Sequence, residues 1–357
     1  MSHSTSELAP PPLDQVVRTR SRLPRYGAAG LFAAGLVVGG VLSALGGFSW
    51  ALFVVYGAVL GTLAVYTGSR VVEGRRKATD RLVTCLVYSA FGIALVPLVS
   101  LIWTVVSRGA ARLDSTFFSN SMVGVVGEGG GAYHAIMGTV IITALAALIS
   151  VPIGLLAAIY LVEYGRGRLK QALTFFVDVM TGIPSIVAGL FAYALFALFF
   201  GPGVRLGIAG AIALSVLMIP VVVRSSEEVL KLVPNELREA SYALGVPKWR
   251  TILKVVVPTA IAGLGTSVTL AVARVIGETA PLLVIVGITA ATNFDPFDGR
   301  MATLPVYAYY QLTQPTIPQD ASLDRAWTAA LVLIILVMAL NVVARLISRF
   351  FAPKTGR

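Results

Sequence analysis

The sequence predicts an all-α integral membrane protein with about eight transmembrane helices. Of its 357 residues, 57% are hydrophobic and only 13% are charged, whereas an ordinary soluble domain is roughly 25% charged. A soluble protein of this length could not cover its surface with so few charged side chains. The apolar runs are also continuous, which excludes a membrane β-barrel, because the strands of a barrel alternate polar and apolar residues.

Eight stretches are apolar enough to cross the bilayer as helices, each of which takes about 20 residues. They lie at residues 27–47, 49–68, 82–106, 135–162, 172–200, 206–223, 258–287 and 327–348. The first is too long for the apolar core of a signal peptide, so we expect it to be retained. The predicted organisation is a cytoplasmic tail at 1–26, a transmembrane hairpin at 27–70 and a six-helix domain at 71–357.

The distribution of Lys and Arg predicts the orientation. If the N-terminus is cytoplasmic, the inside segments carry 22 of these residues and the outside segments carry 5. Because positive residues gather on the cytoplasmic side, we expect both termini to be cytoplasmic. The net charge of +11 therefore reflects the membrane topology. The basic residues are not clustered on one face, as they are in a nucleic-acid-binding protein. We expect the chain to lie in the lipid bilayer and to bind no nucleic acid.

Small residues are frequent in the first predicted helix. Gly35 and Gly39 have the GxxxG spacing that can mark a helix-packing face. In a chain with 35 glycines this spacing also arises by chance, so we do not infer a dimer from it. Cys85 is the only cysteine, which excludes an internal disulfide, and we expect no metal site and no cofactor.

The inside loop at 224–257 contains a short amphipathic helix. Its sequence PNELREASYALG begins with a proline, which suits a first turn, and ends with a glycine, which suits a helix stop. Leu237, Ala240 and Leu244 share one face at helical spacing. We expect this helix to lie along the cytoplasmic surface, with a second helix starting near Pro247 and entering the membrane.

The same loop resembles the EAA loop of ATP-binding-cassette (ABC) importer permeases. Glu239, Ala240 and Ser241 are followed by Gly245 and, after nine intervening residues, by Val-Val-Val-Pro; Ser for Ala and Val for Leu are mild departures. The resemblance implies the MetI-like fold of type I importers and a coupling helix that docks on an ATPase subunit. The coupling residues would be Glu239, Ala240, Ser241, Gly245, Leu237 and Leu244.

ATP hydrolysis is expected to reside in a partner subunit. A P-loop needs a Gly-Lys pair followed by Ser or Thr to hold phosphates, and the sequence contains no Gly-Lys pair. We therefore expect a transport subunit that is not itself an enzyme.

Three ionisable residues lie inside predicted spans, where such groups are rare and often functional: Asp178, Arg274 and Glu278. Arg274 and Glu278 are four residues apart on one predicted helix, so they can pair, and one interpretation is an ion pair packed between helices. The other is an anion path, because a guanidinium offers a planar fork of donors to phosphate oxygens. Glu278 would keep the net charge near zero and accept the proton that phosphate, unlike sulfate, still carries.

A second resemblance favours phosphate. The segments TGIPSIVAG (181–189) and RVIGETAP (274–281), with Gly138 and Thr139, resemble the phosphate-specific permeases over roughly 82–350, closer to the PstA type than to its PstC partner. Gly182 and Pro184 should loosen the fifth predicted helix, and Pro281 the seventh; broken helices are tolerated where they line a cavity.

This resemblance implies a path for inorganic phosphate through a bacterial inner membrane. The path would be lined by Arg274, Glu278, Asp178, Thr181 and Ser185. The implied partners are two copies of an ABC ATPase, a homologous second permease of the PstC type and an extracytoplasmic phosphate-binding protein.

Three alternatives remain open. The chain could import another oxyanion, such as sulfate or molybdate. It could be an ion-coupled secondary transporter, although such proteins often show inverted repeats and we find no clear repeat. It could also be a structural or regulatory membrane protein, in which Arg274 and Glu278 would be dispensable.

Overall fold

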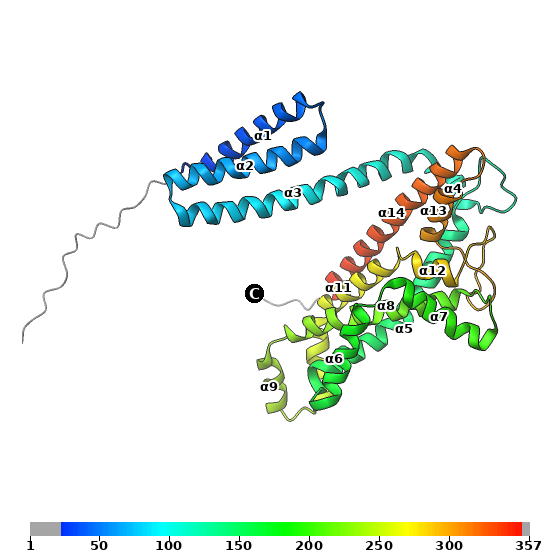
Figure 1. The fold of residues 1–357 in the computed structure, drawn as a ribbon. Coiled ribbons are helices and arrows are strands. Elements are labelled where there is room, and N and C mark those ends of the chain that lie inside the picture. Colours follow the sequence, from blue (N-terminus) through cyan, green and yellow to red (C-terminus); the bar gives the residue numbers. More distant parts are fainter. Residues whose placement is uncertain (1–22, 352–357) are drawn as a thin grey trace, which may run out of the picture. The chain divides into compact units, whose positions relative to one another are not determined.

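A computed structural model describes residues 23–351, and every regular element in that range is a helix (Figure 1). Seven helices of the described range are long and apolar enough to cross a membrane, or eight if the bent pair α6–α7 is one span. The predicted all-α membrane fold is therefore confirmed. The chain divides between Trp103 and Thr104, inside α3 (Arg75–Gly109), into two compact units. The boundary near residue 70 that we predict lies within the first unit and stays a prediction.

The first unit contains a tight hairpin of α1 (Gly27–Leu45) and α2 (Trp50–Val72). Glycines face each other where the two backbones approach: a Cβ atom on Gly35 would lie 2.3 Å from the Cα of Gly61, and one on Gly39 would lie 2.5 Å from the backbone nitrogen of Gly57. Only glycine permits this approach, because any side chain would force the helices apart. The GxxxG spacing is thus used within the hairpin.

A buried carboxylate closes the open end of the hairpin. Glu73 follows α2 and accepts hydrogen bonds from the Leu23 backbone N–H at 3.0 Å and the Ser69 hydroxyl at 2.8 Å, and it pairs with Arg81 at 2.7 Å. Burial alone would raise its pKa, but these donors and the Arg81 charge lower the pKa of Glu73 to about 2. Its charge therefore ties the start of α1, the end of α2 and the start of α3 together.

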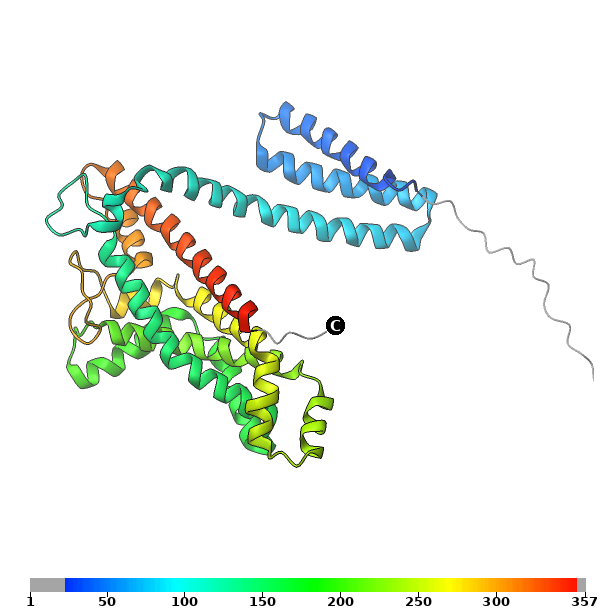
Figure 2. The same cartoon turned by 180° about the vertical axis from the view of Figure 1, so that it is seen from behind.

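The second unit is built on four long helical segments (Figure 2). They are α5 (Tyr133–Ile159), which continues as a π-helical turn (Tyr160–Tyr164), α8 (Gly207–Lys231), α11 (Val257–Val275) and α14 (Gln319–Phe351). Along its length α8 packs against α5 and α11, and α11 packs against α14. Small side chains of α8, such as Ala209 and Ala213, are fully buried, which permits close helix packing.

Two predicted spans are broken. The fifth is two helices, α6 (Gly167–Thr181) and α7 (Ser185–Phe200), which meet at 106°. Pro184 lacks a backbone N–H and disfavours helical geometry in the residue before it, so the chain turns there. The seventh predicted span ends as α11 at Val275, and α12 (Ala280–Ile285) begins after four intervening residues. The predicted loosening at both places is confirmed.

Some predicted boundaries are wrong because hydropathy misses charged helix ends. The sixth predicted span stops at 223, but α8 continues to Lys231; the eighth starts at 327, but α14 starts at Gln319. The connections that precede α5 and α14 also contain short helices, α4 (Ser115–Ser119) and α13 (Leu304–Thr313). The predicted loop at 224–257 is therefore helical at both ends, where it contains the end of α8 and the helical segment that leads into α11.

Candidate functional site

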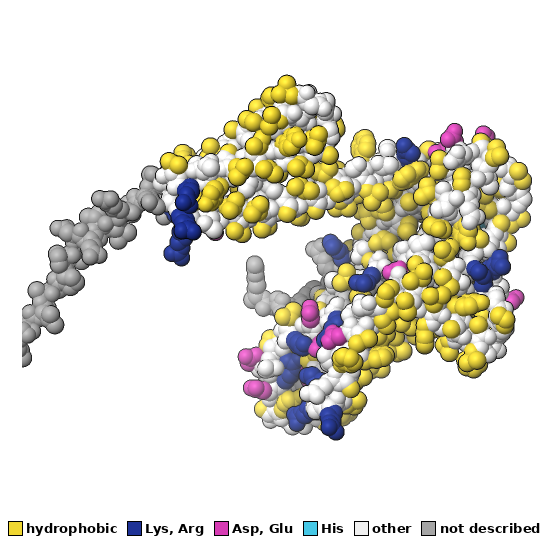
Figure 3. All heavy atoms as spheres, viewed as in Figure 1, with side chains coloured by type: hydrophobic (Ala, Val, Ile, Leu, Met, Phe, Trp, Pro, Cys, Tyr) yellow, Lys and Arg dark blue, Asp and Glu magenta, His cyan; other side chains and the backbone are white. Residues whose placement is uncertain are grey.

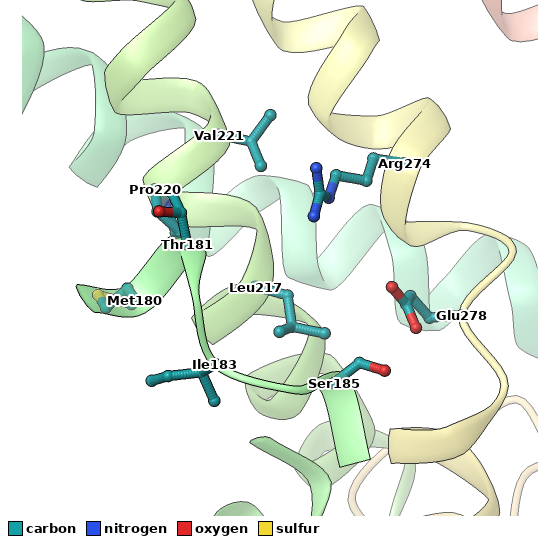
Figure 4. Close-up of a pocket in the computed structure, with 9 residues that line it drawn as sticks. All are labelled: Met180, Thr181, Ile183, Ser185, Leu217, Pro220, Val221, Arg274 and Glu278. Atoms are coloured by element: carbon teal, nitrogen blue, oxygen red, sulfur yellow. The ribbon is translucent and has the colours of Figure 1, made fainter. Parts of the chain in front are cut away.

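A cavity of about 240 Å³ lies where the two broken spans meet α8 (Figure 4). Its polar lining comes from Arg274, Glu278, Thr181 and Ser185. The apolar lining comes from Met180, Ile183, Leu217, Pro220 and Val221. The structure thus brings together four of the five path residues that we predict from the sequence. The fifth, Asp178, does not line the cavity.

Arg274 supplies the positive charge of the cavity. It lies in the last turn of α11, and its guanidinium extends toward the cavity (Figure 4). Within residues 23–351, no hydrogen-bond or ion-pair partner is found for this guanidinium, although the side chain of Glu278 lines the same cavity. A charged fork without partners, in a cavity that also presents two hydroxyl groups, is suited to an anionic ligand.

Glu278 reaches the cavity by a route that differs from our prediction. We expected Arg274 and Glu278 to lie four residues apart on one helix, so that they could pair, but α11 ends at Val275. Glu278 lies in the turn that follows, where its backbone N–H donates to the Val275 carbonyl at 3.1 Å. Since no ion pair joins the two side chains in the described part of the chain, the interpretation as a packed, neutralised pair is not supported.

The break between α6 and α7 places hydroxyl groups and a helix start at the cavity. Thr181 is the last residue of α6, and its hydroxyl donates to the Asp178 carbonyl at 2.6 Å. Ser185 is the first residue of α7. The free N–H groups and the dipole at a helix N-terminus favour negative charge, so the start of α7 adds to the field of Arg274.

The structure places Asp178 beside the cavity and not in its lining. Its carboxylate pairs with Arg224 of α8, one helical turn away from the cavity-lining Pro220 and Val221. Arg224 also pairs with Glu227 at 2.9 Å, and Lys231 pairs with Glu227 at 2.8 Å. The Asp178 carboxylate is therefore a charged link between α6 and α8 beside the cavity. Sequence reasoning missed Arg224, because it assigned this residue to a loop.

The predicted coupling helix is present as α9 (Asn235–Ala243). Gly245 has φ +74°, as its predicted role in the turn requires. The Gly245 N–H donates to the Tyr242 carbonyl at 2.9 Å and the Val246 N–H to the Ser241 carbonyl at 3.2 Å. This pair of bonds is a Schellman motif, which ends a helix at a glycine.

One face of α9 is free and the other is anchored. Leu237 and Leu244 are exposed, the latter at 83%, and Glu239 and Ala240 are also exposed. Ser241 is buried, and its hydroxyl lies 2.8 Å from that of Thr251. Figure 3 shows acidic and basic side chains gathered around α9, in contrast to the apolar surface of the long helices. Of the residues that we predict for coupling, Ser241 is buried, whereas Leu237, Glu239, Ala240, Leu244 and Gly245 lie at the surface.

The second predicted helix of this loop is also confirmed. It starts as α10 (Lys248–Thr251), passes through a π-helical turn (Ile252–Val256) and continues as α11. In the described range no cluster of three or more His, Cys, Asp or Glu side chains could hold a metal ion.

A family of transport proteins matches the part of the chain that contains both the cavity and α9. The model of the family described as "Binding-protein-dependent transport system inner membrane component" matches residues 150–357, which is more than half of the chain. The fold and the match together define the class: this is a binding-protein-dependent transport permease.

Relatives narrow the class. "Phosphate transport system permease protein PstA 1" of Mycobacterium tuberculosis is 48% identical over 286 residues, which are 79% of this chain and 91% of that protein. "Phosphate transport system permease protein PstA" of Pasteurella multocida is 39% identical over 283 residues, 78% of this chain and 97% of that protein. The chain belongs to the PstA family of permeases. An inward-facing structure of the MetNI methionine ABC transporter is also similar, with a TM-score of 0.48 and 21% identity over 62% of this chain and 94% of that chain.

Proposed function

We propose that this chain forms the path by which inorganic phosphate enters the cell, as the PstA-type permease subunit of an ABC importer. One observation carries the proposal: the Arg274 guanidinium faces a cavity and has no partner within residues 23–351. The names of the relatives support phosphate as the anion. A cation that the protein leaves unpaired at such a place is available for a substrate that supplies the negative charge.

The chemistry of the cavity suits phosphate better than sulfate. Arg274 can donate two parallel hydrogen bonds to two oxygens of either anion. Phosphate at neutral pH still carries a proton, which the Glu278 carboxylate can accept, whereas sulfate has no proton to offer and would be repelled. Glu278 also offsets the charge of Arg274, so that the anion is not held too tightly to leave.

The partners follow from the class and from α9. We infer that α9 docks on an ATPase subunit, and that Leu237, Glu239, Ala240, Ser241, Leu244 and Gly245 form or shape the docking surface. The assembly would contain two copies of that ATPase, a homologous permease of the PstC type and an external phosphate-binding protein. Both termini would be cytoplasmic in the bacterial inner membrane, in line with the bias of Lys and Arg.

Substitution of Arg274 tests the proposal. Arg274→Ala should abolish phosphate uptake, while Arg274→Lys should keep the charge but lose the fork and reduce uptake at least tenfold, the equivalent of about 1.4 kcal/mol. Uptake of radioactive phosphate is measured in proteoliposomes that contain the whole importer. Arg300→Ala, which changes an exposed basic residue of the outer loop, is the matched control and should retain uptake.

Two results would contradict the proposal. If Arg274→Ala transports phosphate like the parent, Arg274 serves only in packing. If the parent complex imports sulfate or molybdate rather than phosphate, the cavity is an oxyanion site for a different substrate.

A further inference from the structure

One acidic residue lies where four helical elements meet, on the side of the second unit that carries α9. Glu163 is in the π-helical turn that ends the α5 span. Its carboxylate accepts hydrogen bonds from Arg238 of α9, at 3.0 Å from Nε and 2.8 Å from Nη2. The two side chains are only 6% and 12% exposed. Both donors reach the same carboxylate oxygen, Oε1. Such charge-assisted hydrogen bonds are among the strong ones, and π-turns are frequent at functional positions.

The same guanidinium also binds the end of α8. Arg238 Nη1 donates to the Val233 carbonyl at 2.6 Å, and Nη2 donates to the Leu230 carbonyl at 3.1 Å. Carbonyls near the end of a helix lack some of their usual partners. Arg238 adds a donor to the Leu230 carbonyl, which also accepts from the Val233 N–H at 3.3 Å, and it binds the Val233 carbonyl just beyond the end of α8. One side chain of α9 therefore contacts both α5 and α8.

The chain that enters α11 contacts the same residue. The Lys248 ammonium of α10 donates to the Glu163 backbone carbonyl and lies 5.0 Å from the centre of the Tyr164 ring. Beneath these contacts is a small apolar core contributed by the ends of α5, α8 and α11: Ala158, Leu230, Val233, Val256, Ala260 and Leu264. The polar junction thus covers a packed layer.

We propose that Glu163, Arg238 and Lys248 are positioning residues that make α9 and the adjoining ends of α5, α8 and α10–α11 a single rigid unit. A displacement of α9 then reaches α5 and α8 through side-chain contacts. Without the junction it would act through the Ser241–Thr251 hydroxyl contact to α10 and through the short connections at 232–234 and 244–247. The proposal rests on the proposed function, because it takes α9 as the element that the ATPase moves.

The junction is suited to transmitting a movement of α9 because its contacts depend on one another and are lost together. Loss of either charge leaves the other buried and unpaired, which is strongly unfavourable, so the helices would separate or repack rather than deform slightly. The contrast with the Lys231–Glu227 pair is useful: Lys231 is 56% exposed, and such pairs contribute little.

The experiment compares Glu163→Gln and Arg238→Lys with the control Lys231→Gln in the complete importer. We expect the two junction variants to assemble and hydrolyse ATP, but to spend roughly tenfold more ATP per phosphate imported, within the usual range of coupling free energies. Glu163→Gln combined with Arg238→Lys should be no worse than the poorer single variant, because contacting residues are not additive. The control should couple like the parent.

A distance measurement makes the test independent of phosphate. Spin labels at Arg166→Cys and Glu236→Cys, both exposed positions, in a Cys85→Ser background, report the separation of α9 from the end of α5. In the parent this distance should stay the same with and without bound ATP, and in Glu163→Gln it should broaden or change.

The outcomes separate the two proposals. If the parent imports no phosphate but Glu163→Gln loosens the labelled distance, the proposed function fails and the junction stands. If phosphate is imported and both junction variants keep the parent's coupling and distances, the junction is overturned. Should Glu163→Gln fail to assemble, Arg238→Lys carries the same expectations, and parental behaviour of that variant overturns the proposal.

Discussion

Two arginines of the second unit show what distinguishes a structural from a functional cation. Arg325 is completely buried. It donates to neutral acceptors: Gln311 Oε1, Thr316 Oγ1, Ser322 Oγ and the carbonyls of Gly127 and Gly129. All of its donating groups are engaged, so it stabilises the glycine-rich loop that contains Gly127 and Gly129. Arg274 faces a cavity and engages none of the described residues, so its donors are left for a ligand.

Glu278 determines, in this account, how strongly the cavity holds its anion and which anion it prefers. Glu278→Gln removes the negative charge that offsets Arg274 and that repels an unprotonated oxyanion. We expect phosphate to be released more slowly, and the preference for phosphate over sulfate to fall about tenfold, equivalent to 1.4 kcal/mol. Competition of sulfate with phosphate uptake measures this. An unchanged preference would show that Glu278 does not contact the anion.

At the scale of single residues, the sequence predicts which charged residues lie inside membrane spans but not which residues they pair with. Charges inside apolar runs identify Asp178, Arg274 and Glu278, and four of the five predicted path residues share one cavity. The partner of Asp178 is Arg224, 46 residues later in the chain, and the partner of Glu163 is Arg238. Such long-range pairs depend on helix packing, which no local spacing records.

At the scale of elements, α9 is the most clearly specified. Its proline, acidic first turn and terminal glycine all favour the observed helix, and the glycine adopts the backbone conformation that the turn needs. Two π-turns, at Tyr160–Tyr164 at the end of α5 and at Ile252–Val256 before α11, could not be predicted. Their sequences favour an ordinary α-helix as much as the sequences of their neighbours do. The π-turns depend on contacts between helices.

Gly245→Val tests the element. A β-branched residue at φ +74° is strained, and open space around the Gly245 Cβ position means that the strain comes from the backbone and not from a clash. We expect α9 to lose its Schellman ending and uptake to fall at least tenfold, equivalent to 1.4 kcal/mol, with normal protein levels in the membrane. Quantitative blotting and phosphate uptake measure the two quantities, and normal uptake at normal level would remove α9 from the coupling path.

The break positions belong to this scale too. The sequence predicts helix breaks at Gly182 and Pro184 and at Pro281, and in the structure a helix is interrupted near each of these positions. The angle of 106° between α6 and α7 could not be predicted from the sequence. It depends on what each half packs against: α7 contacts α8 and α12, while α6 contacts α8.

At the scale of the whole molecule, the composition predicts the class and the family match confirms it. The two compact units have different characters. The second contains the cavity, α9 and the residues that the family model matches, whereas the first contains a glycine-packed hairpin closed by Glu73. The proposed transport path therefore lies in the second unit. The exposed apolar side chains of the hairpin suit a lipid environment, and its status as an addition to a six-helix domain stays a prediction.

The central claim is that ATP hydrolysis by partner subunits drives phosphate through this chain. The most direct measurement is uptake by the purified complex in proteoliposomes, with the external binding protein loaded with phosphate or with sulfate. We predict ATP-dependent accumulation of phosphate, little accumulation of sulfate and loss of both in Arg274→Ala. Phosphate accumulation that persists without ATP hydrolysis, or in Arg274→Ala, would contradict the account.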